Sequence, residues 1–166
     1  MRLSHALCGL VLLGLMGCTP AESPVAEEKH MEHPYLFHLV QADLWKAATE
    51  SDSVYYPPTY KQDGFTHATA NPDLLLNVAN HFYTDVPGEW LCLQMTVESL
   101  AGGGIEVVFE GTAPVGDKEP DFPGTDDELF PHILGGIPPS TVLEVHEVVR
   151  SEDGTFLSVV GVTETE

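Results

Sequence analysis

The sequence has very few basic residues. Six of its 166 residues are Lys or Arg, against 26 Asp or Glu, and the formal net charge is −20. A surface with this balance repels polyphosphate backbones, so we expect no nucleic acid polymer as a partner. The shortage of cations also disfavours an anionic ligand unless local groups overcome the negative field. Hydrophobic residues nevertheless make up 43% of the chain, which is typical of a globular fold.

Cysteine is scarce as well, and its three occurrences have different expected roles. Cys8 lies in an N-terminal apolar run, Cys18 follows that run, and Cys92 stands alone in the rest of the chain. A domain with one cysteine cannot form an internal disulfide. Cys92 lies in the strand-like alternation of residues 90–97, so we expect it to pack as a small apolar side chain.

The N-terminal apolar run, residues 6–16, is too short to span a membrane, which takes roughly 20 residues. Because Arg2 precedes it, residues 1–17 are predicted to be a secretory signal peptide. The run ends in Leu15-Met16-Gly17-Cys18, which resembles the lipobox of bacterial lipoproteins. That resemblance implies cleavage before Cys18 and lipidation of its sulfur. An ordinary signal peptide cut nearby is the alternative.

The lipobox resemblance implies an exported protein that is anchored through Cys18 in the bacterial cell envelope. Thr19, where an Asp would favour retention in the inner membrane, favours the outer membrane facing the periplasm. Residues 18–34 are rich in Pro, Ala, Glu and Ser and show no apolar period, so they are predicted to be a flexible tether. Residues 35–166 are predicted to form a single domain.

The apolar periodicity of this domain predicts an α+β fold with mostly antiparallel strands. One helix is expected over residues 41–48, and a second begins at the N-cap Asn71 and buries an apolar stripe that ends at Phe82. His81 is expected to be solvated, and residues 111–128 are expected to be a solvated acidic insertion. The predicted strands are residues 35–40, 90–97, 105–110, 142–150 and 155–162, the last two joined by a hairpin turn at Asp153-Gly154.

Three histidines stand in apolar surroundings and are the sharpest chemical feature of the sequence. His38 lies in the first strand, His67 in residues 64–69 and His132 in residues 129–133. Imidazole titrates near neutrality and can both donate and accept a hydrogen bond, which suits general acid–base work. The alternative for each is a core histidine that is hydrogen-bonded to backbone.

The order of the motifs resembles the bacterial domain-of-unknown-function family 952. The likeness spans about residues 35–150. It departs at Leu134, where the family usually has Tyr, at Thr66, where it has Ile, and in the long acidic loop. The motifs that carry it are Trp45, Gly64-Phe65-Thr66-His67-Ala68-Thr69, His81-Phe82, Phe109-Glu110 and Phe130-Pro131-His132-Ile133-Leu134-Gly135.

This resemblance implies a fold like that of ADP-ribosyltransferases, in which two small, mostly antiparallel sheets with flanking helices surround a cleft. In true transferases the cleft holds NAD. There a His or Arg, a Tyr or Ser, and a Glu on successive strands grip the nicotinamide ribose and stabilise the developing oxocarbenium ion. The nearest counterparts are His38, Thr66 or Thr69, and Glu110. The family has no established activity, and a fold alone does not give one.

Three functions remain open at this point. In the first, the cleft binds or transforms an ADP-ribose-like or nucleotide ligand. The second is a divalent metal site built from the three histidines, with Glu110 as a candidate fourth ligand. The third is a non-catalytic envelope lipoprotein that binds a small molecule or a protein. No cofactor is assigned. For the first function, His67, His132 and Glu110 are the candidate catalytic residues, and His38, Thr66, Thr69 and Tyr60 are the candidate ligand-binding residues.

Overall fold

The computed structural model describes residues 32–120, 122–125 and 127–163. The predicted signal peptide, Cys18 and nearly all of the predicted tether lie outside these residues. No helix in the described ranges is both long and apolar enough to cross a membrane.

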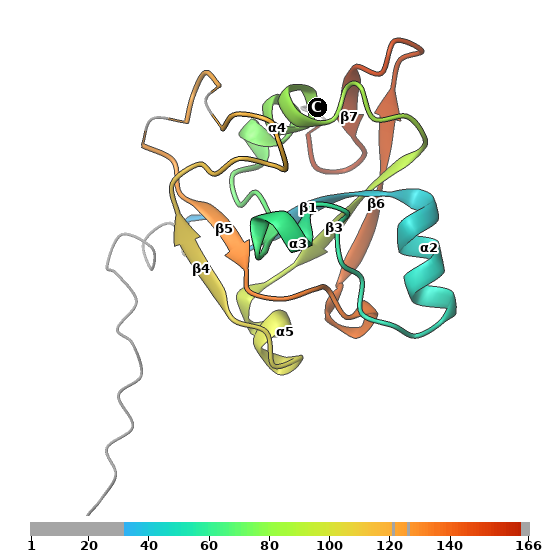
Figure 1. Ribbon diagram of the computed structural model, residues 1–166, viewed down its shortest axis with the longest axis vertical. Coiled ribbons are helices and arrows are strands. Elements are labelled where there is room, and N and C mark those ends of the chain that lie inside the picture. The colour runs from blue at the N-terminus through green and yellow to red at the C-terminus, as the bar shows by residue number, and fades with distance from the viewer. Residues whose placement is uncertain (1–31, 121, 126, 164–166) are drawn as a thin grey trace, which may run out of the picture.

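Within the described residues the strands form two sheets, and every pair of neighbouring strands is antiparallel (Figure 1). The α+β class with two mostly antiparallel sheets is therefore confirmed. The four-stranded sheet has the order β1 (Leu36–Gln41), β3 (Trp90–Met95), β6 (Glu144–Arg150) and β7 (Phe156–Val159). The three-stranded sheet has the order β2 (Thr66–His67), β5 (Phe130–Ile133) and β4 (Val107–Glu110).

Four α-helices accompany the sheets in the described part of the chain, and the sequence predicted two of them. The predicted pair are α2 (Ala42–Glu50) and α4 (Leu75–Phe82). The N-cap Asn71 accepts a hydrogen bond from the backbone N–H of Asp73, 3.0 Å away. That cap begins a 3-10 turn, Pro72–Leu74, which leads into α4. The helices are α2 (Ala42–Glu50), α3 (Tyr60–Asp63), α4 (Leu75–Phe82) and α5 (Val97–Gly102), and a second 3-10 turn covers Pro139–Thr141.

Helix α5 corrects the predicted strand over residues 90–97, which ends at Met95. Thr96 and Ser99 form a reciprocal capping box, because the Thr96 hydroxyl accepts from the Ser99 N–H and the Ser99 hydroxyl accepts from the Thr96 N–H, both at 3.0 Å. The box satisfies two backbone donors at the start of the helix. Ser99 stands where a capping box usually has Glu or Gln. The start of the helix was therefore not recognised in the sequence, and the strand was predicted to continue to residue 97.

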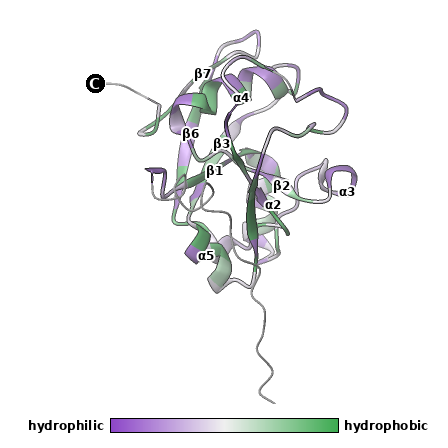
Figure 2. Cartoon of the chain, turned by 90° about the vertical axis from the view of Figure 1, so that its left-hand side faces the viewer, coloured by the Kyte–Doolittle hydropathy of each residue, from purple (hydrophilic) through white to green (hydrophobic). Residues whose placement is uncertain are grey.

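The strand β1 contributes to two apolar clusters, one on each face, as alternation along a strand requires. Leu36 and Val40 pack with Trp45 of α2 and with residues of the three-stranded sheet. Phe37 and Leu39 pack in the second cluster, which includes Leu75 and Ala79 from α4. Cys92 is fully buried in that second cluster, as expected of a packing residue. Figure 2 shows apolar strands in the middle of the molecule and polar residues on α3 at its edge.

The loop over residues 111–128 is not the solvated insertion that its composition predicted. Val115 is buried, and the Lys118 ammonium donates to the backbone carbonyl of Phe82, 2.7 Å away. His81, which was also expected to be solvated, stacks on Phe122 with ring centroids 4.9 Å apart and hydrogen-bonds through Nε2 to the carbonyl of Glu119. The described part of this loop is therefore packed against α4.

Arg150 ties the hairpin between β6 and β7 to the segment that follows α4. Its guanidinium lies over the Phe156 ring, 4.4 Å from the centroid. It donates only to backbone carbonyls among the hydrogen bonds recorded for the described residues, namely those of Tyr83, Thr84, Val86, Gly88 and Gly154. One of the few cations of the chain is thus used to hold the fold together.

Candidate functional site

The two sheets meet where the edge strands β1 and β2 run past each other. Phe37 and Thr69 exchange two backbone hydrogen bonds, with N to O distances of 2.8 and 2.9 Å. One residue further along β1, the Nδ1 atom of His38 lies 2.6 Å from the backbone oxygen of His67. This junction places His38 from the first sheet next to His67 from the second.

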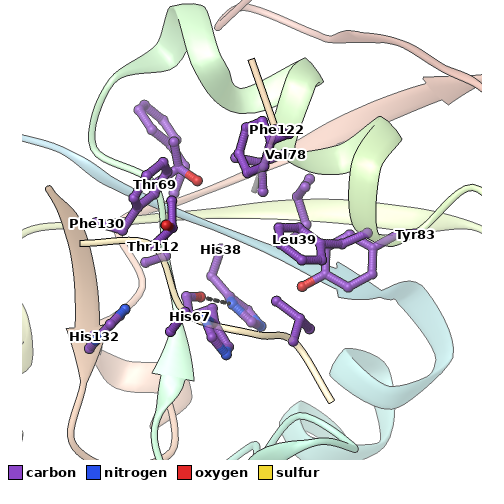
Figure 3. Close-up of a pocket in the computed structure, with 15 residues that line it drawn as sticks. His38, Leu39, His67, Thr69, Val78, Tyr83, Thr112, Phe122, Phe130 and His132 are labelled. Carbon is purple, nitrogen blue, oxygen red and sulfur yellow. Dashed lines mark hydrogen bonds between the residues drawn. The ribbon is translucent and has the colours of Figure 1, made fainter. Parts of the chain in front are cut away.

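A small cavity lies at this junction, and all three candidate histidines line it (Figure 3). The free volume inside it is about 30 Å³, which is room for one or two water-sized groups. Thr69 also lines it, as the sequence analysis proposed for a ligand-binding residue. The remaining walls are largely aromatic, from Phe37, Phe82, Tyr83, Phe122 and Phe130, and the loop adds Thr112, Ala113 and Val115.

His38 is held in one protonation state by its surroundings. Its side chain is buried, and burial lowers its pKa from 6.5 to about 4, although the bond to the His67 carbonyl opposes the change. A carbonyl only accepts, so Nδ1 carries the ring proton. The other nitrogen, Nε2, is buried and has no hydrogen-bond partner within the described residues.

His67 is paired with a carboxylate that the sequence analysis did not single out. Its Nε2 lies 3.1 Å from Oδ2 of Asp63, whose side chain is only 3% exposed. The backbone N–H of Gly116 donates to the same carboxylate. Burial lowers the pKa of His67, the Asp63 charge opposes that change, and His132 adds to it. The loop and the imidazole therefore share one buried anion.

The pairing of Asp63 with His67 depends on Gly64. Asp63 is the last residue of α3, and Gly64 after it has a positive φ of 84°, the left-handed conformation that glycine adopts most readily. The chain turns there from helix into β2, which brings residues four apart into contact. The sequence signal was an Asp followed by a helix-ending Gly just before the histidine motif.

His132 forms a second imidazole–carboxylate pair. β2 and β5 place it directly opposite His67, and the two rings are 5.7 Å apart in an edge-on arrangement. Its Nδ1 lies 3.0 Å from Oε2 of Glu110 on β4, whose side chain is 63% exposed. The Phe65 ring stacks on the His132 ring, with ring centroids 4.0 Å apart. Burial lowers the pKa of His132 and the bond to Glu110 opposes it, while its Nε2, like that of His38, is buried without a partner in the described chain.

Three of the candidate residues do not line the cavity: Glu110, which bonds to His132 from behind, Thr66 and Tyr60. Thr66 points away from it, because neighbouring residues of β2 face opposite sides, and its buried hydroxyl donates to the backbone oxygen of Gly135 at 2.7 Å. Tyr60 packs edge-on against Tyr56, with ring centroids 4.8 Å apart. Conversely, the structure adds Asp63, Tyr83 and Phe122 to the surroundings of the three histidines.

The histidines are not arranged as a metal site. Among the described residues, no group of three or more His, Cys, Asp or Glu side chains is placed to hold a metal ion. One nitrogen of each candidate histidine already bonds to a group of the chain, namely the His67 carbonyl, Asp63 or Glu110. What the arrangement provides is a set of oriented, mainly neutral imidazoles around a narrow space.

Comparison with known proteins identifies the family. The family described as "Protein of unknown function (DUF952)" matches residues 39–145. The chain belongs to this family. No curated protein matches the sequence.

Among solved structures, the DUF952 chain is similar to protein CC0527 from Caulobacter crescentus. The TM-score is 0.56 at 17% sequence identity, over 74% of this chain and 93% of that one. A double mutant of CC0527 aligns over the same shares with a TM-score of 0.52 and the same identity. At this identity the likeness gives the fold alone, and both relatives and family leave the activity open.

Burial of His38 generates a prediction about stability and pH. In the unfolded chain the pKa of this residue is near 6.5, so it is protonated below that pH. In the folded chain its pKa is about 4, so it stays neutral until the pH falls to that value. Stability is therefore complete above the unfolded pKa and is lost as pH falls through this window, by about 3 kcal/mol. Denaturant unfolding at several pH values should show a smaller acid loss for His38→Gln, which keeps a donor for the His67 carbonyl but does not titrate. Parallel profiles for the two proteins would contradict this account.

The Asp63 carboxylate generates a prediction about His67. In Asp63→Asn the charge that stabilises the imidazolium is gone, so the pKa of His67 falls below its already lowered value. An NMR titration of the imidazole resonances measures this directly. Asp73→Asn, at an exposed position before α4, is the matched control and should leave His67 unchanged. The pairing has no electrostatic role if both variants titrate like the parent.

Proposed function

We propose that this protein is a small-molecule-binding lipoprotein of the bacterial envelope whose histidine-lined cavity takes part of an ADP-ribose-like or nucleotide ligand. The observation that carries the proposal is the gathering of His38, His67 and His132 around one cavity, with carboxylates behind two of them. The three residues come from separate strands on two sheets, and core packing alone does not require them to share one space.

The ADP-ribosyltransferase-like reading of the fold is part of this proposal. It rests on the motif resemblance, and two splayed antiparallel sheets with a site at their junction are compatible with it. In this reading His38 and His67 hold ribose hydroxyls, and Thr69 completes the wall. His132 acts as donor or general base. Glu110 does not itself line the cavity and supplies negative charge from behind His132, toward the anomeric carbon. Thr66 and Tyr60 drop out of the proposed contacts because they lie away from the cavity.

One observation favours a second candidate function, a non-catalytic envelope protein. The free volume of about 30 Å³ is far too small for a whole nucleotide, so most of such a ligand would lie outside or displace the loop over residues 111–128. Each histidine also has one nitrogen bonded within the fold, as a structural histidine would. In this alternative the partner is a small molecule or protein bound elsewhere on the surface.

Titration calorimetry of the full chain in detergent with ADP-ribose tests the proposal. We expect saturable heat that weakens by about tenfold or more in the His67→Ala, His132→Ala double variant, because each lost hydrogen bond costs about 1 kcal/mol. His33→Ala, a histidine away from the cavity, serves as the control and should bind like the parent. Absence of heat at millimolar ligand, with near-UV circular dichroism showing a folded protein, sinks the nucleotide form of the proposal.

The envelope location is proposed from the lipobox resemblance. In this proposal residues 1–17 are a signal peptide, Cys18 is lipidated, residues 18–34 are a tether and residues 35–166 form the domain. The protein is then anchored at the periplasmic face of the outer membrane. In a bacterial host, labelled fatty acid should be incorporated into the protein and the label should be lost in Cys18→Ser. Cys8→Ser, within the proposed signal peptide, is the matched control and should keep the label. Label retained by Cys18→Ser would remove the proposed anchor.

A further inference from the structure

Exposed aliphatic side chains gather on β6 and β7, the strands of the four-stranded sheet that lie away from β1 (Figure 1). Val145, Val149, Leu157 and Val160 are between 38% and 54% exposed. Single exposed apolar residues are ordinary on a protein surface, whereas a contiguous group of them marks an interaction site. No residue of either strand lines the histidine cavity, so this surface is separate from it.

The pairing of β6 with β3 shows which face the β6 residues share. Val145 lies directly opposite Leu93, which is fully buried in the core cluster that includes Trp45 of α2. Side chains alternate along a strand, so Glu147 and Val149 point to the same side as Val145. The core face of β3 therefore continues onto β6, where its side chains are exposed.

The two residues from the β7 segment belong to the same face. Phe156 and Val159 pack on the opposite side of the sheet, in the cluster that includes residues of α4. Leu157 follows Phe156 and Val160 follows Val159, so both point to the other side. The Val160 N–H donates to the Glu147 carbonyl, 2.9 Å away, which keeps these two residues side by side. The outer apolar face is defined as Val145, Val149, Leu157 and Val160.

The free edge of β7 is closed to a further strand. The side-chain amide of Asn80, on α4, donates to the Phe156 carbonyl at 3.0 Å and accepts from the Phe156 N–H at 2.8 Å. The Thr163 hydroxyl accepts from the Val159 N–H at 2.8 Å, and the Thr163 N–H donates to the Val159 carbonyl. These contacts occupy the backbone groups that an added strand would need. A partner is therefore expected on the face of the sheet and not at its edge.

The charges at the outer apolar face are negative. Glu147 is exposed and stands between Val145 and Val149 on β6. It also lines a polar groove of about 680 Å³ beside the face, together with Glu89 and Glu152. No ion pair is recorded for these three carboxylates within the described part of the chain. The face thus combines apolar surface with uncompensated negative charge.

This charge narrows the choice of occupant. Among the described residues that line the groove, Arg150 is the one Lys or Arg, and its guanidinium donates to backbone carbonyls. In a symmetric pair the same patch of both copies meets, so two negative Glu147 side chains would come together. An anionic lipid surface would be repelled as well. Charge complementarity favours a cationic partner.

We propose that the outer apolar face docks a cationic amphipathic helix of another protein. The apolar side chains of the helix pack on Val149 and Leu157, and a Lys or Arg pairs with Glu147. A helix fits because helices form the layer that covers sheet faces, as α2 does beside β1. Docking here does not depend on a ligand in the cavity, and it gives a protein partner a defined place on the surface.

A synthetic peptide of about 14 Leu and Lys residues, spaced so that Leu forms one face of a helix, is the probe. Fluorescence anisotropy of the labelled peptide measures its binding to the full chain in phosphatidylcholine nanodiscs, with empty nanodiscs as the blank. We expect the Val149→Thr, Leu157→Thr double variant to weaken binding by about tenfold or more, because the peptide buries less apolar area. Thr retains strand propensity, so the sheet is kept.

The matched control is Val54→Thr, Leu134→Thr, two apolar residues that are 42% and 45% exposed elsewhere on the surface. This variant should bind the peptide like the parent. Absence of binding to the parent, an equal loss in both double variants, or no loss in either overturns the proposal.

Glu147→Gln tests the role of charge. It should weaken binding by about threefold, since an exposed ion pair contributes little, whereas Glu106→Gln changes the net charge equally at an exposed site before β4 and should bind like the parent. Equal effects of the two variants would show that binding follows net charge alone, and would overturn the proposal. A dimer of the full chain in detergent that the Val149→Thr, Leu157→Thr variant dissociates would assign the face to a second copy and overturn it as well.

Discussion

The contact between β1 and β2 is the constraint on which the rest of the site depends. Both are edge strands of their sheets, and an unpaired edge presents backbone groups that must find partners. Here Phe37 and Thr69 satisfy one another, and the side chain of His38 satisfies the His67 carbonyl. The side-chain hydrogen bond from His38 thus takes the place of the next backbone hydrogen bond between the two strands. It also fixes which nitrogen of His38 is protonated, so the same bond joins the sheets and sets the tautomer of this buried ring.

A second feature of this junction is that His38 and His132 each keep one buried ring nitrogen with no hydrogen-bond partner in the described chain. A buried polar atom without a partner costs roughly 1–3 kcal/mol, and Nε2 of His38 and Nε2 of His132 are two such atoms in the described chain. Leu or Phe at positions 38 and 132 would avoid that cost. The loop over residues 111–128 also contributes to the site. Its Gly116 N–H donates to the Asp63 carboxylate, which orients His67. Its Val115 and Phe122 form part of the cavity wall. Loop position and imidazole orientation are therefore coupled through a single carboxylate.

How much of this was predictable varies with the range of the interaction. Helix α4 could be predicted because its cap and apolar stripe are local. The one-turn helix α3 and the Ser-based cap of α5 are too short or too unusual to stand out. The packing of residues 111–128 could not be predicted, because acidic and proline-rich composition outweighed Val115 and Phe122. The grouping of the histidines came from the motif resemblance, since no pattern within one strand shows that two sheets will meet there.

The negative surface charge and the composition of the cavity wall both disfavour anions, although they arise from different residues. The surface carries a large negative excess, which lowers the local concentration of anions by long-range repulsion, an effect that salt screens within about 8–10 Å. The cavity wall is largely aromatic and holds no Lys or Arg among the described residues, so it offers a buried anion no compensating charge. The tautomers of His38 and His132 are set within the fold, by the carbonyl of His67 and the carboxylate of Glu110.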